Sequence, residues 1–144
     1  MRYRKSNHSV YCTEYHLVWI PRYRRRILKD GVKAYLNKLL WHVPNLDPDI
    51  EVIKLNIQED HVHMVILIPP RIAVASVVQY IKTQTAKQMR VKFSFLQNVY
   101  WGHPGIWSRG YCVSSIGLNE KEILRYVENQ DKEDKGQLQL TLES

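Results

Sequence analysis

The sequence predicts an α+β protein built on a four-stranded antiparallel sheet, with two helices on one face and an additional helix near the C-terminus. Two observations lead to this prediction. Apolar residues alternate in four stretches and recur every three or four residues in three others, in the order β-α-β-β-α-β-α. A chain of 144 residues suffices for one hydrophobic core. We therefore treat residues 1–144 as a single domain, with tails at 1–8 and 137–144 expected to be flexible or to contact a second subunit.

The first half of the chain contributes three of the strands. The expected elements are strands at residues 10–20, 50–57 and 61–68 and a helix at residues 30–43. In the strands, apolar side chains alternate or run continuously, whereas in the helix they recur at three and four residues. Pro21 ends the first strand, and Pro69 and Pro70 end the third, because proline cannot donate a hydrogen bond to a ladder.

The second half adds helices at residues 73–93 and 120–135 and a strand at residues 106–116. Residues 94–105 are expected to be a loop, in which the pattern does not decide whether Tyr100 and Trp101 are core or stacking residues. Asn119 is a predicted N-cap with Glu122 three residues later, and Gly136 is the predicted helix end. Four antiparallel strands with this order of helices correspond to a ferredoxin-like arrangement.

The strand at residues 61–68 places two histidines on one face. His61 and His63 are two residues apart, so their Cβ atoms lie roughly 6.5–7 Å apart on the same side of the strand, a separation at which two imidazoles can bind one divalent ion. Half-exposed surface histidines would show the same pattern. Asp60 would either orient an imidazole or serve as an ordinary turn residue. His16 is either a third histidine near the site or a strand residue satisfied by a neighbour.

The net charge of +7 is unevenly distributed. Residues 1–29 contain eight Lys or Arg and one Glu, and residues 71–119 contain six basic residues and no carboxylate. Two basic stretches favour a phosphate-rich partner over a plain solvated face. The predicted backbone-contacting residues for nucleic acid are Arg22, Arg24, Arg25, Arg26, Lys82, Lys87 and Arg90.

Several protein classes are disfavoured. No apolar run reaches the roughly 18–20 residues of a membrane span, and the N-terminus lacks the apolar segment of a signal peptide, so we expect a cytoplasmic protein without a membrane partner. Cys12 and Cys112 are far apart in the sequence and are expected to be reduced.

Tyr126 and Gln130 are four residues apart on the last helix and therefore share a face. A tyrosine has a pKa of about 10, so it needs help to act as a nucleophile at neutral pH. A divalent ion held by two imidazoles and an amide oxygen would favour the phenolate, and this ligand set favours Mg²⁺ or Mn²⁺. A tyrosine that simply packs on the sheet would produce the same pattern.

Four blocks of the sequence resemble the single-tyrosine, HUH-type transposases of the insertion sequence 200/605 family. They are YHLVWIPRYRRRIL (15–28), EDHVHMVILIPP (59–70), IWSRGYCVSSIG (106–117) and ILRYVENQ (123–130), in the family's order. The resemblance implies that His61, His63 and Gln130 hold the metal and that Tyr126 is the nucleophile. Cys112, where the family commonly has an aromatic residue, is a small departure outside this set.

The same resemblance implies a homodimer whose two sheets join edge to edge, in which the tyrosine helix of one subunit can complete the histidine site of the other. It implies cleavage of single-stranded DNA beside hairpins at element ends, through a 5′-phosphotyrosine intermediate and without a nucleotide cofactor. Two other classes remain open at this point: a catalytically silent or domesticated single-stranded nucleic-acid-binding protein, and a metal-dependent phosphodiesterase that uses water. A pure binding protein would not need Tyr126 together with the histidines.

Overall fold

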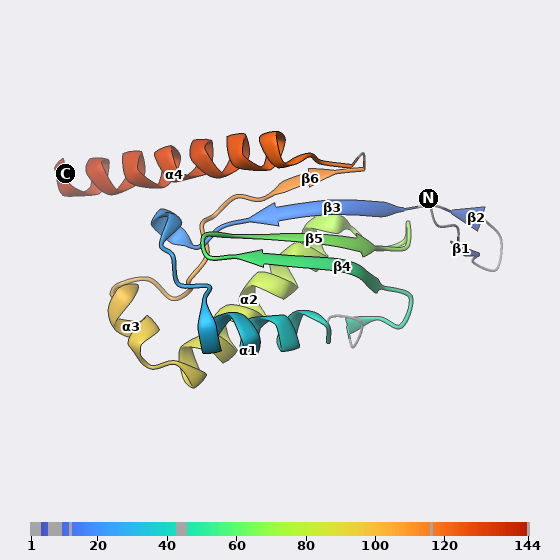
Figure 1. The fold of residues 1–144 in the computed structure, drawn as a ribbon, viewed down its shortest axis with the longest axis horizontal. Coiled ribbons are helices and arrows are strands. Elements are labelled where there is room, and N and C mark those ends of the chain that lie inside the picture. Colours follow the sequence, from blue (N-terminus) through green and yellow to red (C-terminus); the bar gives the residue numbers. More distant parts are fainter. Residues whose placement is uncertain (1–3, 6–9, 12, 43–45, 116, 144) are drawn as a thin grey trace.

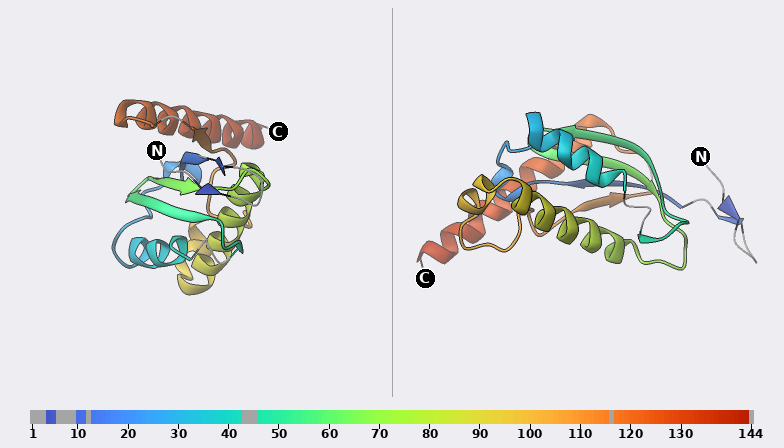
Figure 2. Two further views of the ribbon diagram at one scale, coloured as in Figure 1. Left: turned by 90° about the vertical axis from the view of Figure 1, so that its right-hand side faces the viewer. Right: turned by 90° about the horizontal axis from the view of Figure 1, so that it is seen from below.

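A four-stranded antiparallel sheet forms the middle layer of the molecule (Figures 1 and 2). The structure is a computed structural model that describes residues 4–5, 10–11, 13–42, 46–115 and 117–143, with their side chains between residues 13 and 136. The strands lie in the order β4 (Glu51–Gln58), β5 (His61–Leu67), β3 (Glu14–Trp19), β6 (Cys112–Ser114). This order, with two crossing helices on one face, confirms the predicted ferredoxin-like architecture.

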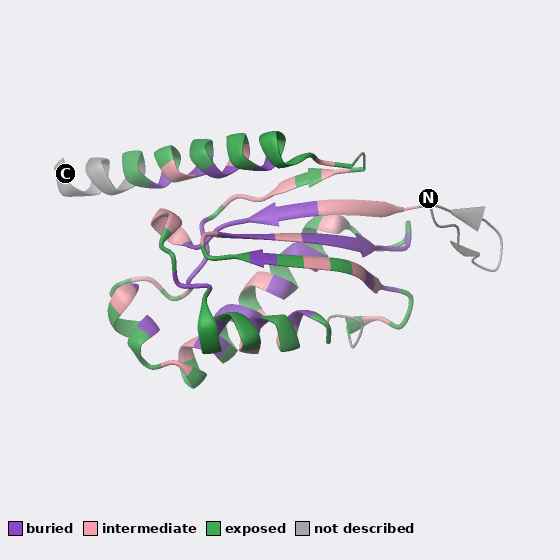
Figure 3. Cartoon of the chain, viewed as in Figure 1, coloured by how far each residue is buried: buried purple, intermediate pink, exposed green. Residues whose placement is uncertain are grey.

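The main core lies between the sheet and two helices, α1 (Asp30–Leu40) and α2 (Val74–Lys92). Alternation in the strands sends one set of side chains into this layer, and the stripes of both helices meet it (Figure 3). Fully buried members from each element are Leu17, Leu36, Met64, Ile66, Val77 and Met89. Burial of each such side chain stabilises the fold by about 1.5–3 kcal/mol.

The opposite face of the sheet carries α4 (Glu120–Glu143), which runs along β3 and β6 (Figure 1). Val18 of β3 and Ile20, which follows the strand, pack there against Ile123 and Val127 of α4 in a second, smaller cluster. The backbone N–H of Glu122 donates to the Asn119 side chain at 2.9 Å, which confirms the predicted N-cap. None of the helices in the described ranges combines the length and apolar composition that a membrane-spanning helix needs.

The first predicted strand is divided into two. Glu14 is the last residue of β3 that pairs with β5, opposite Leu67. The carbonyl of Thr13 still accepts from the N–H of Ile68, but Pro69 and Pro70 follow at once and cannot continue the ladder. Instead, β2 (Val10–Tyr11) pairs with β1 (Arg4–Lys5) in a separate two-stranded sheet. The predicted N-terminal tail thus contains a short strand, and residues 1–3, 6–9 and Cys12 lie outside the described residues.

The fourth predicted strand is wrong over most of its length. Only β6 pairs with β3, while Trp107 forms an isolated bridge with Pro21. The ammonium group of Lys82 explains this difference, since its Nζ lies 2.6 Å from the carbonyl oxygen of Ser108 and 3.2 Å from those of the next two residues. These carbonyls accept from Lys82 instead of from a neighbouring strand.

The predicted loop at residues 94–105 contains a short helix, α3 (Phe95–Val99). The two aromatic residues of this segment differ in burial. Tyr100 is 1% exposed and belongs to the core, whereas Trp101 is 85% exposed. The helices α1 and α2 otherwise lie where periodicity predicts them, with residue 43 outside the described ranges.

The predicted end of the last helix at Gly136 is also wrong, because α4 continues to Glu143. Gly102 is the one glycine of the described residues with positive φ, so Gly136 does not adopt the left-handed conformation that ends helices. A glycine inside a helix costs only about 1 kcal/mol relative to alanine, which is too little to stop a helix of this length.

Candidate active site

His61 and His63 lie on the face of β5 that points toward α4, because both line one cavity with residues from the start of that helix. Their strand neighbours Val62 and Met64 point the other way, into the main core. The pairing register places Val18 of β3 opposite His63, so the two histidines lie beside the part of the sheet on which α4 packs. The sequence prediction that both imidazoles share one face is therefore confirmed.

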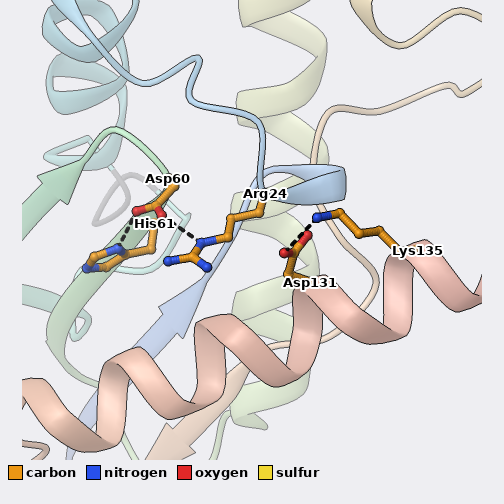
Figure 4. Close-up of polar contacts among 5 residues, drawn as sticks. All are labelled: Arg24, Asp60, His61, Asp131 and Lys135. Atoms are coloured by element: carbon orange, nitrogen blue, oxygen red, sulfur yellow. Dashed lines mark hydrogen bonds and ion pairs between the residues drawn. The ribbon is translucent and has the colours of Figure 1, made fainter.

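Asp60 orients His61. Its Oδ1 lies 2.9 Å from Nδ1 of His61, and its Oδ2 accepts from Nε of Arg24 at 2.8 Å (Figure 4). Burial opposes ionisation of Asp60, but these two hydrogen bonds outweigh it and hold the pKa of the carboxyl below its ordinary value. An ionised carboxylate only accepts, so Nδ1 of His61 carries the proton and Nε2 of the neutral ring is left with the lone pair.

His16 is the third histidine of this face. Its Nδ1 lies 3.1 Å from Nε2 of His63, and the ring centroids are 5.3 Å apart. Burial first, and then the neighbouring His16, Lys54 and His61, lower the pKa of His63. His63 is therefore biased toward the neutral form that binds metals. Of the two interpretations offered by the sequence, His16 proves to be both near the site and paired with a neighbour.

A cavity of about 800 Å³ opens beside the two histidines. Polar side chains of β4 and the hairpin turn form one wall, and the start of α4 forms the other. The residues that line it are Arg26, Lys54, Asn56, Gln58, Glu59, Asp60, His61, His63, Leu118, Glu120, Ile123 and Leu124. Arg26, one of the predicted DNA contacts, thus lies at the histidine site.

Tyr126 and Gln130 do not line this cavity. Tyr126 packs against the cluster formed by Val18, Ile20, Ile123 and Val127, and its hydroxyl is buried without a hydrogen-bond partner among the described residues. Burial, followed by nearby acidic groups and the Cys112 thiol, raises the pKa of Tyr126 well above its ordinary value. In this position the phenol is protonated and separated from the histidines.

Gln130 lies in a buried polar cluster one turn further along α4. Its Nε2 donates to Oδ1 of Asp134 at 3.3 Å, and the same oxygen accepts from Oγ of Ser108 at 2.8 Å. Gly110 lies directly against the Gln130 amide, with no room for a larger residue. Sequence reasoning missed Asp134, although its spacing of four residues from Gln130 and eight from Tyr126 places all three on one helix face.

The residues at β5 fit one side of a divalent metal site. A carboxylate that holds Nδ1 of a histidine is the usual support of a metal-ligating imidazole. Within the described ranges, His, Cys, Asp and Glu side chains form no group of three or more that could hold a metal ion. The pair at β5 thus offers two ligands, and Gln130 is held elsewhere in this arrangement.

The remaining predicted DNA contacts differ in position and in whether the side chain is already bound within the protein. Arg22, Lys87 and Arg90 line a second cavity of about 680 Å³ beside α2, together with Arg109 and the edge of Trp107. Arg25 is exposed, whereas Arg24 is bound to Asp60. Lys82 also borders the second cavity, but its ammonium group is bound to three carbonyl oxygens.

Comparisons with known proteins agree on one family. A family model described as "Transposase IS200 like" matches residues 9–130. The chain is 32% identical over 132 residues to the ISDra2 transposase TnpA of Deinococcus radiodurans, which covers 90% of this chain and 93% of the relative. It is 30% identical over 140 residues to the transposase for insertion sequence element IS200 of Salmonella typhimurium, covering 94% and 88%.

Solved structures are similar as well. A crystal structure of a candidate transposase from Deinococcus radiodurans superposes with a TM-score of 0.78 and 30% identity, covering 88% of this chain and 97% of that one. A REP-associated tyrosine transposase bound to a REP hairpin shares the fold, with a TM-score of 0.51, 19% identity and coverage of 86% and 68%. The chain belongs to the IS200-like family of DNA transposases, which are HUH tyrosine nucleases.

Proposed function

We propose that this transposase is a metal-dependent single-stranded DNA endonuclease and strand transferase that acts through a 5′-phosphotyrosine intermediate. The observation that carries the proposal is the histidine pair of β5, supported by Asp60 and open to a cavity on the face that α4 crosses. Tyr126 and Gln130 lie on the sheet-facing side of that same helix.

His61 and His63 would hold the ion, and Gln130 would complete the set when its part of an α4 helix reaches the histidines. The chemistry of two imidazoles and an amide oxygen, with other positions open, suits Mg²⁺ or Mn²⁺. Such an ion would neutralise phosphate oxygens at the point where charge develops. Asp60 accepts from Nδ1 of His61, so in the neutral ring the lone pair lies on Nε2, the nitrogen that is available as a ligand.

Tyr126 is the proposed nucleophile. Its Oη loses the phenolic proton and forms a bond to the phosphorus of the scissile phosphodiester, while the bond from phosphorus to the 3′ oxygen breaks. The 3′ oxygen takes up a proton and leaves as a hydroxyl, and the 5′ phosphate stays on Tyr126. Attack by another 3′-OH reverses these steps and joins two strands, so the bond energy is conserved and no nucleotide cofactor is needed.

The position of α4 supports a resting state. The hydroxyl of Tyr126 is buried without a partner among the described residues, an arrangement that costs about 1–3 kcal/mol. Burial also raises the pKa of this phenol, which opposes its use as a nucleophile where it lies. We infer that a homodimer, in which the helix of one subunit reaches the histidines of the other, assembles the complete site.

The proposed substrate is a single strand that carries hairpins at the ends of the element. The net charge of +7 and the cluster of Arg22, Lys87 and Arg90 at the second cavity support binding to phosphates. A structural neighbour with the same fold is bound to a REP hairpin, which supports a folded strand as the ligand. Arg26, at the histidine cavity, would contact the strand close to the cleavage point.

The decisive experiment incubates the protein with Mg²⁺ and a labelled hairpin oligonucleotide from the element end. The wild type should give a protein–DNA adduct that survives denaturant, and Tyr126→Phe should abolish the adduct while hairpin binding persists. An adduct in Tyr126→Phe would place the nucleophile elsewhere. Cleavage without any adduct would indicate attack by water, and binding without cleavage would indicate a silent DNA-binding protein.

The metal assignment has its own test. His61→Ala and His63→Ala should each abolish cleavage, and Gln130→Ala should reduce it less, because two imidazoles on one strand face would carry most of the coordination, whereas the amide is on a helix that can move. Calorimetric titration with Mn²⁺ should show weaker binding in both histidine variants. Unchanged Mn²⁺ affinity in those variants would contradict the assignment.

A further inference from the structure

Tyr23 and Arg24 form a strained turn that contacts both α4 and the histidine site of β5. They lie in η1 (Arg22–Arg24), directly after β3, and their φ angles are 62° and 52°. Two consecutive residues other than glycine in this region cost roughly 1–2 kcal/mol each. Such a conformation persists only where its surroundings hold it in place.

One anchor of the turn comes from α4. The backbone N–H of Tyr23 donates to Oδ2 of Asp134 at 3.0 Å. Asp134 is 1% exposed, and its other oxygen accepts from Ser108 and Gln130. The carboxylate therefore joins three segments: the turn after β3, the segment before β6, and the helix that carries Tyr126.

The other anchor is at the histidine site. Nε of Arg24 donates to Oδ2 of Asp60 at 2.8 Å, and Oδ1 of Asp60 holds Nδ1 of His61 at 2.9 Å (Figure 4). The neighbouring Arg25 is exposed, so the contact at Arg24 is specific to one member of the arginine run. A continuous path of hydrogen bonds thus leads from α4 through two adjacent residues to His61.

We propose that the Tyr23–Arg24 turn couples the docking of α4 to the orientation of His61, with Asp134 and Arg24 as positioning residues. When Asp134 holds the N–H of Tyr23, the turn keeps Arg24 on Asp60, and Asp60 keeps the ring of His61 in place. When α4 leaves, the turn loses that anchor and relaxes. The proposal rests on the proposed metal site, and it adds that metal binding and α4 docking strengthen each other, as reciprocal linkage requires.

The first test is the Mn²⁺ affinity of the full-length protein without DNA, measured from the free Mn²⁺ signal in electron paramagnetic resonance. Arg24→Ala should weaken binding by up to about 10-fold, the lower end of the roughly 10–100-fold effect of losing a direct partner of a metal-bound histidine, because Arg24 acts on His61 through Asp60. Arg25→Ala, which removes the same charge from the adjacent position, should stay within about twofold of wild type. Equal losses of affinity in the two variants would show that only the net charge matters, and would overturn the proposal.

The second test acts from the far end of the path. Asp134→Asn should weaken Mn²⁺ binding several-fold, although Asp134 does not touch a histidine. Because Asp134 also holds Gln130, the comparison is repeated in a Gln130→Ala background, where the same loss should remain. The double variant Arg24→Ala/Asp134→Asn should bind no more weakly than Arg24→Ala alone, since both act along one path. Additive losses, or a loss that vanishes without Gln130, would overturn the proposal.

A third measurement separates this inference from the metal site itself. In the metal-free protein, Arg24→Ala should accelerate amide hydrogen exchange at Tyr23 and along α4 relative to Arg25→Ala. Circular dichroism shows whether Asp134→Asn is folded, and Ser108→Ala, which removes only one contact of Asp134, replaces it if not. If the wild type binds no Mn²⁺, the proposed metal site fails, and the exchange data still decide the coupling. Unchanged exchange in Arg24→Ala would refute the coupling directly.

Discussion

Gly110→Ala tests whether α4 is held in its docked position by close packing at Gln130. A Cβ at residue 110 would overlap the side-chain oxygen of Gln130 and lie 3.1 Å from its Cδ and 3.5 Å from its Nε2. Gln130 cannot simply swing away, because it is buried and its amide is bonded to Asp134. Overpacking of this kind costs about 1–3 kcal/mol, and we expect the loss to fall on α4 docking.

Urea unfolding and amide exchange along α4 measure this loss. Gly110→Ala should lower the free energy of unfolding by that amount, or the melting temperature by roughly 3–10 °C for a chain of this size, and it should accelerate exchange in α4. Gly136→Ala is the matched control, because nothing lies within 4 Å of its Cβ and it is inside a helix. It should stabilise by about 0.5–1 kcal/mol. An unchanged Gly110→Ala protein would refute the described packing of α4.

Three further predictions concern single side chains. Lys87→Ala should lower the slope of log affinity against log salt by about 0.7 for a single strand, as loss of one phosphate contact requires, and fluorescence anisotropy at several salt concentrations measures it. Burial lowers the pKa of Lys82 to about 8, below its ordinary value of 10.5, so the unfolded chain holds more protons between these values. The free energy of unfolding should therefore rise between pH 8 and 10.5 in the wild type relative to Lys82→Met. Denaturant titrations across that range measure it, and the same pH dependence of the unfolding free energy in both proteins would contradict the prediction. His16→Asn, whose amide oxygen can still accept from Nε2 of His63 and so leave the lone pair on Nδ1 free for the metal, should retain Mn²⁺ affinity better than His16→Leu, and equal affinities would show that the contact does not matter.

Periodicity predicted the layers of this fold because each layer has a simple chemical signature. Alternation in β3 and β5 placed Leu17 and Met64 in the main core, and the same alternation placed His61 and His63 together on the other face. The cap at Asn119 was equally local, since it depends on residues three positions apart.

The errors arose where a distant side chain decides the backbone. The segment from Ser108 to Gly110 is compatible with a strand, but Lys82, on another element, binds its carbonyls. The first strand was overextended because its partner ends at Pro69, which is remote in sequence. Gly136 predicts a helix end that α4 does not have, because glycine permits the left-handed conformation without requiring it.

The position of Tyr126 was beyond sequence reasoning for a further reason. Tyr126, Gln130 and Asp134 form one row on α4, and a row of that kind can face either an apolar cluster or a metal site. In the docked helix, Tyr126 packs against the apolar cluster, whereas Gln130 and Asp134 form buried hydrogen bonds.

That division has an energetic consequence. Among the described side chains, the apolar contact of α4 is small, consisting chiefly of Ile123, Val127 and Tyr126 against Val18 and Ile20. It leaves the tyrosine hydroxyl without a partner in the same part of the chain. Docking therefore depends heavily on Asp134, whose hydrogen bonds to Ser108 and Tyr23 offset the burial of its charge. A helix held by a polar anchor can be released when that anchor finds other partners, whereas one held by a large apolar face would have to expose that face to water. If Tyr126 is the nucleophile, as proposed, the docked position of α4 keeps it away from the histidines until the anchor is released.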